Sequence, residues 1–236
     1  MTDDGPKGSY DSDTIRTDAG PLVMTFIGHG TLMFRFNDKV IHIDPVTREG
    51  DYSKLPKADL VIITHQHGDH LEPPLIARLR KDDTTVILPE VCLEPTAEKV
   101  DRKHLVVMKN GDVKTVEGIK IEAVPAYNLR HMRRPGQPFH PKGQGNGYVM
   151  TFGKTRVYVA GDTENIPEMK KLGDIDVAFL PMNLPYTMTP EMVADAAKAF
   201  RPGILYPYHY GKTDPQELVK LLKDEKGIEV RVRKLQ

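Results

Sequence analysis

The residues with the clearest capacity for chemistry lie in one short segment, residues 64–70 (THQHGDH), directly after an apolar run. Histidine and aspartate are common ligands of divalent cations, and four of them follow the end of one predicted strand. In an extended segment His65 and His67 point to the same side, so both imidazoles can bind one ion. A glycine-containing turn then brings Asp69 and His70 toward a second ion. The alternative is a polar loop that contains histidines without a metal.

The pattern His-x-His-x-Asp-His after a hydrophobic strand resembles the signature of the metallo-β-lactamase superfamily. Members of this superfamily share an αββα sandwich with a one- or two-metal site at its edge. The resemblance therefore implies an α/β protein, in which two mixed β-sheets pack face to face with helices outside.

Length and composition set the domain organisation. A chain of 236 residues with 39% hydrophobic content and no long apolar run fits one large domain, which we place at residues 21–236. Residues 1–20 are rich in Asp, Gly and Ser and have few apolar side chains, so we expect a flexible tail or a loosely docked arm there. The later segments alternate strands and helices in two halves, 21–100 and 105–236, which agrees with two related sheets.

The charge balance and the single cysteine indicate which binding partners and which cellular location to expect. Lys plus Arg and Asp plus Glu number 33 each, so bulk charge gives no reason to expect nucleic acid or a membrane as partner. The single cysteine, Cys92, excludes an internal disulfide and agrees with a cytoplasmic location, and no signal peptide or membrane span is visible. The sequence also allows a homo-oligomer.

A glycine-rich turn holds a further histidine. Residues 28–31 (GHGT) and the later Asp44-Pro45 resemble elements of one superfamily branch, the ascorbate-6-phosphate lactonase-like metal-dependent hydrolases. This resemblance implies that His29 lies beside the metal site and contacts substrate or a ligand. A histidine that merely tolerates a glycine-rich turn is the alternative.

Residues 125–147 form the longest stretch without predicted secondary structure, and such loops often carry function. The stretch has four basic residues, among them Arg130 and Lys142, and no acidic one. If it lies over a metal site, it favours a small anionic substrate, and we predict Arg130 and Lys142 as substrate-binding residues. A solvated basic loop is the alternative.

The same loop offers two candidates for the next histidine ligand, His131 and His140. In many superfamily members the ligand directly follows the strand, where this chain has Asn128. We choose His140, because residues 139–143 (FHPKG) resemble a segment of the lactonase-like branch, and we assign Asn128 a hydrogen-bonding role toward substrate.

Two further ligands follow predicted strands. Asp162 comes after an apolar strand and just before a turn, and it matches the bridging aspartate of the superfamily; a turn aspartate without a metal is the alternative. His209 matches the final ligand. Asn183 and Tyr186 resemble a substrate-side segment, although loop packing would explain them equally well.

The resemblance implies two divalent ions, one on His65, His67 and His140 and one on Asp69, His70 and His209, with Asp162 between them. Two such ions can share a water and lower its pKa toward about 7, which supplies hydroxide without a serine or cysteine nucleophile. Nitrogen and oxygen ligands suit zinc or manganese, with iron as a further option.

The predicted function is hydrolysis of an anionic ester, phosphodiester or lactone, with Asp69 and His29 as catalytic residues and His29 stabilising developing negative charge. The alternatives are a redox enzyme and a non-catalytic binding protein on the same fold. Superfamily oxygen reductases carry glutamate at the position of His67 and usually a flavin domain, so His67 and the short chain argue against the redox alternative.

Overall fold

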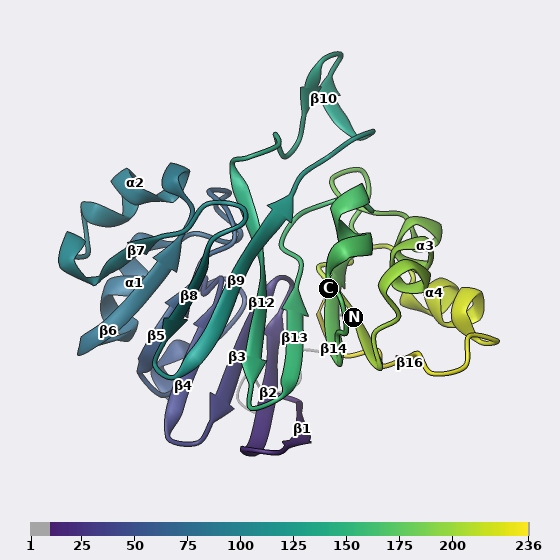
Figure 1. Ribbon diagram of the computed structural model, residues 1–236. Coiled ribbons are helices and arrows are strands. Elements are labelled where there is room, and N and C mark those ends of the chain that lie inside the picture. Colours follow the sequence, from purple (N-terminus) through teal and green to yellow (C-terminus); the bar gives the residue numbers. More distant parts are fainter. Residues whose placement is uncertain (1–9, 236) are drawn as a thin grey trace, which may run out of the picture.

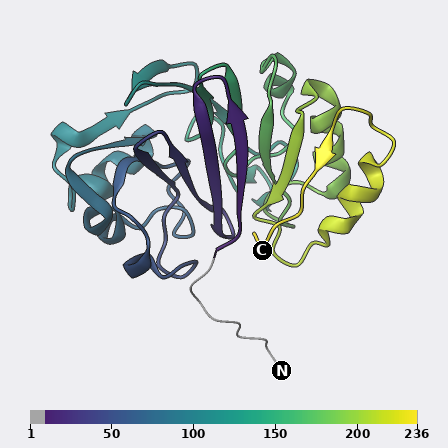
Figure 2. The same cartoon turned by 90° about the horizontal axis from the view of Figure 1, so that it is seen from below.

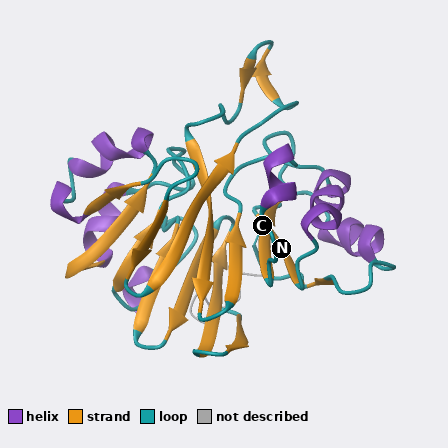
Figure 3. Ribbon diagram, viewed as in Figure 1, coloured by secondary structure: helices purple, strands orange, loops and turns teal. Residues whose placement is uncertain are grey.

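The computed structural model describes residues 10–235 and has two seven-stranded β-sheets packed face to face, with helices on the outer side of each (Figure 1, Figure 3). Seen from below in Figure 2, the strands form the middle layers and the helices lie at both flanks. The predicted αββα sandwich with two mixed sheets is therefore confirmed.

The first sheet has the strand order β1-β2-β3-β4-β5-β6-β7. Its strands are β1 (Ser12–Thr17), β2 (Gly20–Gly28), β3 (Thr31–Phe36), β4 (Lys39–Ile43), β5 (Ala58–Ile62), β6 (Arg80–Leu88) and β7 (Leu105–Val107). Strands β1 to β4 are antiparallel neighbours, whereas β4 to β7 run parallel. Parallel strands need crossover connections. Helices α1 (Pro73–Leu79) and α2 (Leu93–Ala97) lie in two of them.

The second sheet repeats this arrangement, with the order β16-β15-β14-β13-β12-β9-β8. Its strands are β8 (Val113–Val116), β9 (Ile119–Ala126), β12 (Gly145–Phe152), β13 (Thr155–Val159), β14 (Val177–Pro181), β15 (Ile204–Tyr208) and β16 (Glu229–Val230). Strands β13 to β16 are parallel, and the others are antiparallel. Helices α3 (Pro190–Phe200) and α4 (Pro215–Leu222) connect β14, β15 and β16.

Short elements complete the described chain. The 3-10 helices are η1 (Tyr52–Lys54), η2 (Glu90–Cys92), η3 (Arg102–His104) and η4 (Pro167–Lys171). Strands β10 (Met132–Arg134) and β11 (Gln137–Pro138) form a hairpin that projects from the sandwich in Figure 1, inside the stretch that we expected to lack secondary structure. Among residues 10–235 no helix is both long enough and apolar enough to cross a lipid bilayer.

The core between the sheets is built from aromatic and aliphatic side chains on their inner faces. The ring centroids of Phe26 and Tyr206 are 5.2 Å apart, and those of Phe179 and Tyr206 are 4.8 Å apart. Phe36 packs edge-on against Phe152 at 5.1 Å. The Phe26–Tyr206 and Phe36–Phe152 contacts join strands of different sheets, so burial of apolar area holds the two layers together.

Two boundary predictions need correction. Residues 105–107, which we placed in the second half, form β7 and pair with β6 of the first sheet. The predicted tail, residues 1–20, is wrong for residues 12–17, which form β1 beside β2; residues 1–9 lie outside the described residues. Composition misled us because an edge strand obtains its stabilisation from backbone hydrogen bonds and a few polar contacts rather than from a large apolar face.

One of those contacts ties β1 to the end of the chain. The Asp13 carboxylate accepts hydrogen bonds from the Tyr206 hydroxyl and, at 2.8 Å, from Nη2 of Arg233. The Arg233 guanidinium also lies 5.8 Å from the centre of the Phe26 ring. Segments about as far apart in sequence as this chain allows therefore share one polar cluster.

We expect Asp13→Ala to lower the free energy of unfolding by about 1–2 kcal/mol, because it leaves Arg233 and Tyr206 without their acceptor at a partly solvated site. Urea unfolding followed by circular dichroism measures the change. Asp38→Ala, in the exposed β3–β4 turn, is the matched control and should have little effect. Equal stability of the two variants would contradict the role of the cluster.

Candidate metal centre

Strand ends place the candidate ligands. Segment 64–70 follows β5, Asp162 follows β13, and His209 follows β15. The carboxyl ends of parallel strands in a sheet meet at one edge, and two packed sheets bring two such edges together. His140 comes from the loop between β9 and β12. The fold thus gathers side chains that are up to about 145 positions apart in sequence.

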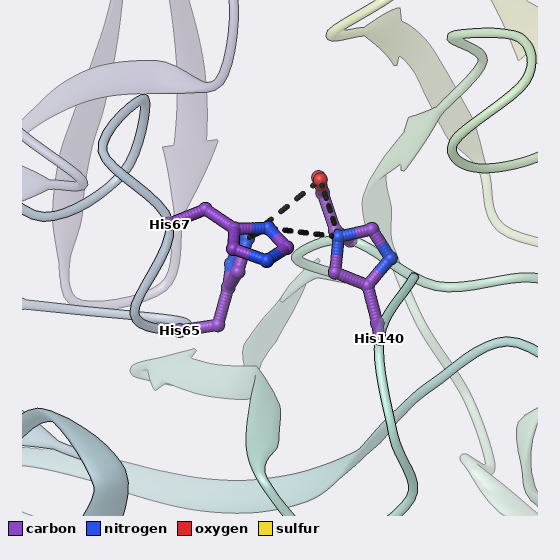
Figure 4. A group of neighbouring side chains, drawn as sticks. His65, His67 and His140 are labelled. Carbon is purple, nitrogen blue, oxygen red and sulfur yellow. Dashed lines mark hydrogen bonds and ion pairs between the residues drawn. The ribbon is translucent and has the colours of Figure 1, made fainter. Parts of the chain in front are cut away.

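Four ligand atoms converge in the first group. Nδ1 of His67 is 3.1 Å from Nε2 of His65 and 3.2 Å from Nε2 of His140. Oδ2 of Asp162 is 3.1 Å from Nε2 of His140 and 3.7 Å from Nε2 of His65. In Figure 4 the three imidazoles point toward one another from two different segments of the chain.

A second group shares the same aspartate. Oδ1 of Asp162 is 3.5 Å from Nε2 of His70 and 3.6 Å from Nε2 of His209. Oδ2 of Asp69 lies 3.5 Å from Nε2 of His209 and 3.5 Å from Nε2 of His29. The structure therefore brings together all seven predicted ligands, and His29 lies beside them.

Unsatisfied polar atoms support binding of cations by these groups. Nε2 of His70, both ring nitrogens of His209 and Oδ1 of Asp162 are buried without a hydrogen-bond partner in the described residues. Buried polar groups are nearly always paired, because leaving one unpaired costs about 1–3 kcal/mol. Donor atoms around one tetrahedral zinc ion lie roughly 3.3 Å apart. The spacing of the first group fits this requirement.

The electrostatics of the first group keep two of its imidazoles, those of His65 and His67, neutral beside an ionised carboxylate. Burial lowers the pKa of His65 well below its usual value and that of His67 to about 4. Burial would raise the pKa of Asp162, but the nearby His209 and His70 hold it well below its usual range. Neutral nitrogen and ionised oxygen are the protonation states that bind metals.

His70 differs from the other imidazoles. Burial opposes its protonation, but the carboxylates of Asp162 and Asp44 raise its pKa to about 9. A cation on Nε2 would replace the proton there, so ion binding by the second group would compete with protons below about pH 9.

Three of the imidazoles, those of His65, His70 and His140, are oriented through Nδ1. Nδ1 of His70 lies 2.7 Å from Oδ2 of the buried Asp44, and Nδ1 of His65 lies 3.0 Å from the Thr64 hydroxyl. Nδ1 of His140 is 2.6 Å from Oδ1 of Asn128, which also accepts from the His140 backbone N–H. Such contacts fix the ring and the tautomer, so that Nε2 faces the centre.

Close packing also constrains the turn that carries His29. A Cβ atom on Gly30 would lie 2.6 Å from Cε1 of His70, so only glycine fits there. His29 itself has a φ of 51°. Its ring centroid lies 3.7 Å from that of His209.

The structure separates the two loop histidines. Nδ1 of His131 is 2.9 Å from Oε1 of Glu164. His140 belongs to the first ligand group, whereas His131 belongs to neither group. The buried Glu164 also accepts hydrogen bonds from the backbone N–H groups of residues 129–131 and from Nδ2 of Asn128. Asn128 therefore positions His140 rather than reaching toward substrate.

A cavity of about 430 Å³ opens over both groups. It is lined by His29, Arg48, His67, Gly68, Asp69, Arg133, Phe139, His140, Asp162, Asn183, Tyr186 and His209. Asn183 and Tyr186 are thus among the lining residues, and their role in substrate binding stays a prediction. The predicted substrate-binding residues Arg130 and Lys142 do not line it, and Lys142 instead pairs with Glu168 at 2.7 Å.

Sequence reasoning missed three residues that shape the site. Asp44 and Glu164 orient ligands, and Arg48 lines the cavity. Asp44 directly follows a strand, a position that signals a functional carboxylate as it did for Asp162. Glu164 and Arg48 carry no comparable signal, because their roles depend on tertiary contacts.

Comparison with known proteins identifies the family. The model of the β-lactamase superfamily domain matches residues 23–209. This chain belongs to the β-lactamase superfamily. The resemblance seen in its His-x-His-x-Asp-His segment is therefore confirmed.

Several of the similar proteins are hydrolases by name. A UPF0173 metal-dependent hydrolase of Methanopyrus kandleri is 30% identical over 89% of this chain and 94% of its own length. A protein of Parabacteroides distasonis classed with the metal-dependent hydrolases is 49% identical, with a TM-score of 0.89 over 97% of this chain and all of that chain. Igni18, a metallo hydrolase from Ignicoccus hospitalis, is 25% identical, with a TM-score of 0.73 over 91% of this chain and 95% of that one. The chain is thus a member of a metal-dependent hydrolase family.

We expect His140→Ala to reduce the amount of metal that the purified protein retains after dialysis, because it removes one nitrogen donor from the first group. His131→Ala, in the same loop, should retain metal as the wild type does. Plasma mass spectrometry measures the metal per chain. The reverse order of the two variants would show that His131 is the ligand.

Asp44→Asn should weaken metal binding by about 10–100-fold, as loss of a hydrogen-bonded carboxylate behind a ligand histidine does elsewhere. The amide keeps the shape of the side chain but removes the charge beside Nδ1 of His70. Competition with a chromophoric chelator measures the affinity, and thermal unfolding of the metal-free proteins checks that the variant is folded. An unchanged affinity would argue against this role for Asp44.

Proposed function

We propose that this chain is a dinuclear metal-dependent hydrolase that cleaves an anionic ester, phosphodiester or lactone. One observation carries the proposal: the two oxygens of Asp162 face different groups of imidazoles, Oδ2 toward His65 and His140 and Oδ1 toward His70 and His209. A carboxylate can bind two cations at once through its two oxygens. This arrangement favours a pair of ions over a single one.

The two ions would be held by nitrogen and oxygen donors. The first would take His65, His67 and His140, the second Asp69, His70 and His209, and Asp162 would serve both. When bound, such ions lower the pKa of a water toward neutrality and polarise the group to be cleaved. The donor set suits zinc, manganese or iron. Cys92 takes no part, because it is buried away from these groups and burial raises the pKa of its thiol.

Two side chains at the cavity can act in the reaction: Asp69 on the attacking water and His29 on the negative charge that develops. Burial alone would raise the pKa of Asp69, but His209 and His29 hold its carboxyl well below its usual range, so it is ionised. The ionised carboxylate of Asp69 can accept a hydrogen bond from the attacking water and so orient it. Nε2 of His29, 3.5 Å away, can donate to the negative charge that develops.

The cavity walls support an anionic small molecule as substrate. A volume of about 430 Å³ suits a metabolite-sized ligand. Residues 126–147 contain no acidic side chain, and one of their arginines, Arg133, lines the cavity. A phosphate or carboxylate would find a complementary charge there.

Metal removal tests the proposal directly. Dialysis against a chelator should abolish hydrolysis of bis-p-nitrophenyl phosphate or of a lactone panel, and added zinc or manganese should restore it. Asp162→Asn should lower kcat by about 100-fold or more, because stabilisation of transition-state charge by metals contributes several kcal/mol. Initial rates with each substrate, together with the metal content per chain, give the answer.

The remaining outcomes favour other functions. Two ions per chain without turnover of any ester would favour a binding protein. Consumption of dioxygen by the loaded protein would favour a redox enzyme. A metal content of one ion per chain with full activity would refute the dinuclear assignment.

A further inference from the structure

Two arginines reach the cavity from opposite halves of the fold. Arg48 lies in the loop after β4 of the first sheet, and Arg133 lies on β10, in the projecting hairpin between β9 and β12 of the second (Figure 1). Nη2 of Arg48 is 3.7 Å from Oδ2 of Asp69, and Nη2 of Arg133 is 3.2 Å from Nε2 of His67. Both guanidinium groups therefore approach the segment that carries the candidate ligands.

We propose that Arg48 and Arg133 form an anion subsite that selects esters with a phosphate or carboxylate next to an aromatic or apolar group. This inference rests on the proposed hydrolase function, since it assigns the substrate class of that same site. From the sequence, Arg48 was not singled out, and Arg133 was counted only as one of the four basic residues of the loop 125–147.

The hydrogen bond from Arg133 to His67 depends on which ring nitrogen of His67 carries the proton. A guanidinium only donates hydrogen bonds, so Nε2 of His67 is the acceptor in this contact. If His67 binds a cation through Nδ1, the atom that faces His65 and His140, its proton resides on Nε2. The ring then has no acceptor for Arg133. Arg133 would turn its N–H groups to an acceptor in the cavity.

A neighbouring ring keeps Arg133 near the cavity. The Arg133 guanidinium carbon lies 5.3 Å from the centre of the Phe139 ring, within cation–π range. Phe139 itself lines the cavity.

One guanidinium nitrogen of Arg48 is hydrogen-bonded within the protein, and the other nitrogens can donate to a ligand. Its Nε donates to Oε1 of Glu49 at 2.8 Å, which fixes the plane of the group. The 3.7 Å between Nη2 and Asp69 is too long for a hydrogen bond. The side chain is 55% exposed, so a ligand oxygen can reach Nη2 without displacing packed atoms.

Two aromatic side chains of the cavity indicate that the substrate also carries an apolar group. Phe139 and Tyr186 line the cavity and pack edge-on, with ring centroids 5.0 Å apart. Tyr186 remains 45% exposed. Covering an exposed aromatic surface with a flat or apolar group is favourable, so the part of the substrate beside the anion should be of this kind.

Binding of phenylphosphonate, a non-hydrolysable anion with an aromatic ring, tests the subsite. Isothermal titration calorimetry on the metal-loaded full chain should give a Kd about 10-fold higher or more for Arg48→Gln and for Arg133→Gln than for the wild type. Arg133→Lys should retain part of the affinity, since it keeps the charge but loses the fork of donors. Metal content should be unchanged in all variants.

Arg134→Gln is the matched control. Arg134 is the next residue of β10, it donates to Oε1 of Gln137 at 2.7 Å, and it does not line the cavity. Its Kd for phenylphosphonate should equal that of the wild type. With the neutral ester phenyl acetate, Arg134→Gln should likewise show the KM of the wild type.

The outcomes separate the subsite from the proposed function. An unchanged Kd in both Arg48→Gln and Arg133→Gln, or no measurable binding to the loaded wild type, overturns the subsite even if the chain hydrolyses esters. A raised Kd in these variants but not in Arg134→Gln supports the subsite even if no ester is turned over. An equal loss in Arg134→Gln would reduce the effect to general surface charge and overturn it.

Discussion

The buried carboxylate of Asp44 is the constraint on which the site depends. It accepts hydrogen bonds from the backbone N–H of Thr64 at 2.8 Å, from the Thr64 hydroxyl at 2.6 Å, and from His70 at 2.7 Å. A fully buried charge without such partners would be strongly destabilising, so these groups must stay in place. Because Asp44 follows β4 and Thr64 follows β5, one side chain fixes two strand ends and the segment that carries the first four ligands.

The second half of the fold uses the same principle with Glu164. Its buried carboxylate holds the backbone of residues 129–131 and the amide of Asn128, and Asn128 in turn orients His140. The two halves also meet directly at the site, where the backbone N–H of Asn146 donates to the carbonyl of Thr64 at 2.9 Å. In each half of the fold one buried carboxylate thus fixes the orientation of a histidine: Asp44 that of His70 and Glu164, through Asn128, that of His140. The packing of the two sheets sets the distance between the ligands of the first half and those of the second.

These relations explain what sequence could predict. Ligands such as Asp162 and His209 could be found because each follows an apolar strand, and a strand end is visible in the local pattern. The roles of Asn128 and Arg48 could not be found, since they depend on partners that come close only in the folded chain. Strand β1 was missed for a related reason: its stabilisation comes from pairing with β2 and from Arg233, which its own composition does not reveal.

Charge connects metal binding to substrate binding. The carboxylates of the buried Asp44 and Asp162 and of the half-buried Asp69 lie around one imidazole whose pKa is raised, that of His70. These side chains alone would repel an anion, because negative charge prevails among them and their surroundings screen it poorly. Divalent cations on the same ligands would reverse the sign of the field toward the cavity. The anionic substrate that we propose would therefore bind only after the ions, and this order would be a consequence of the chain's own charges.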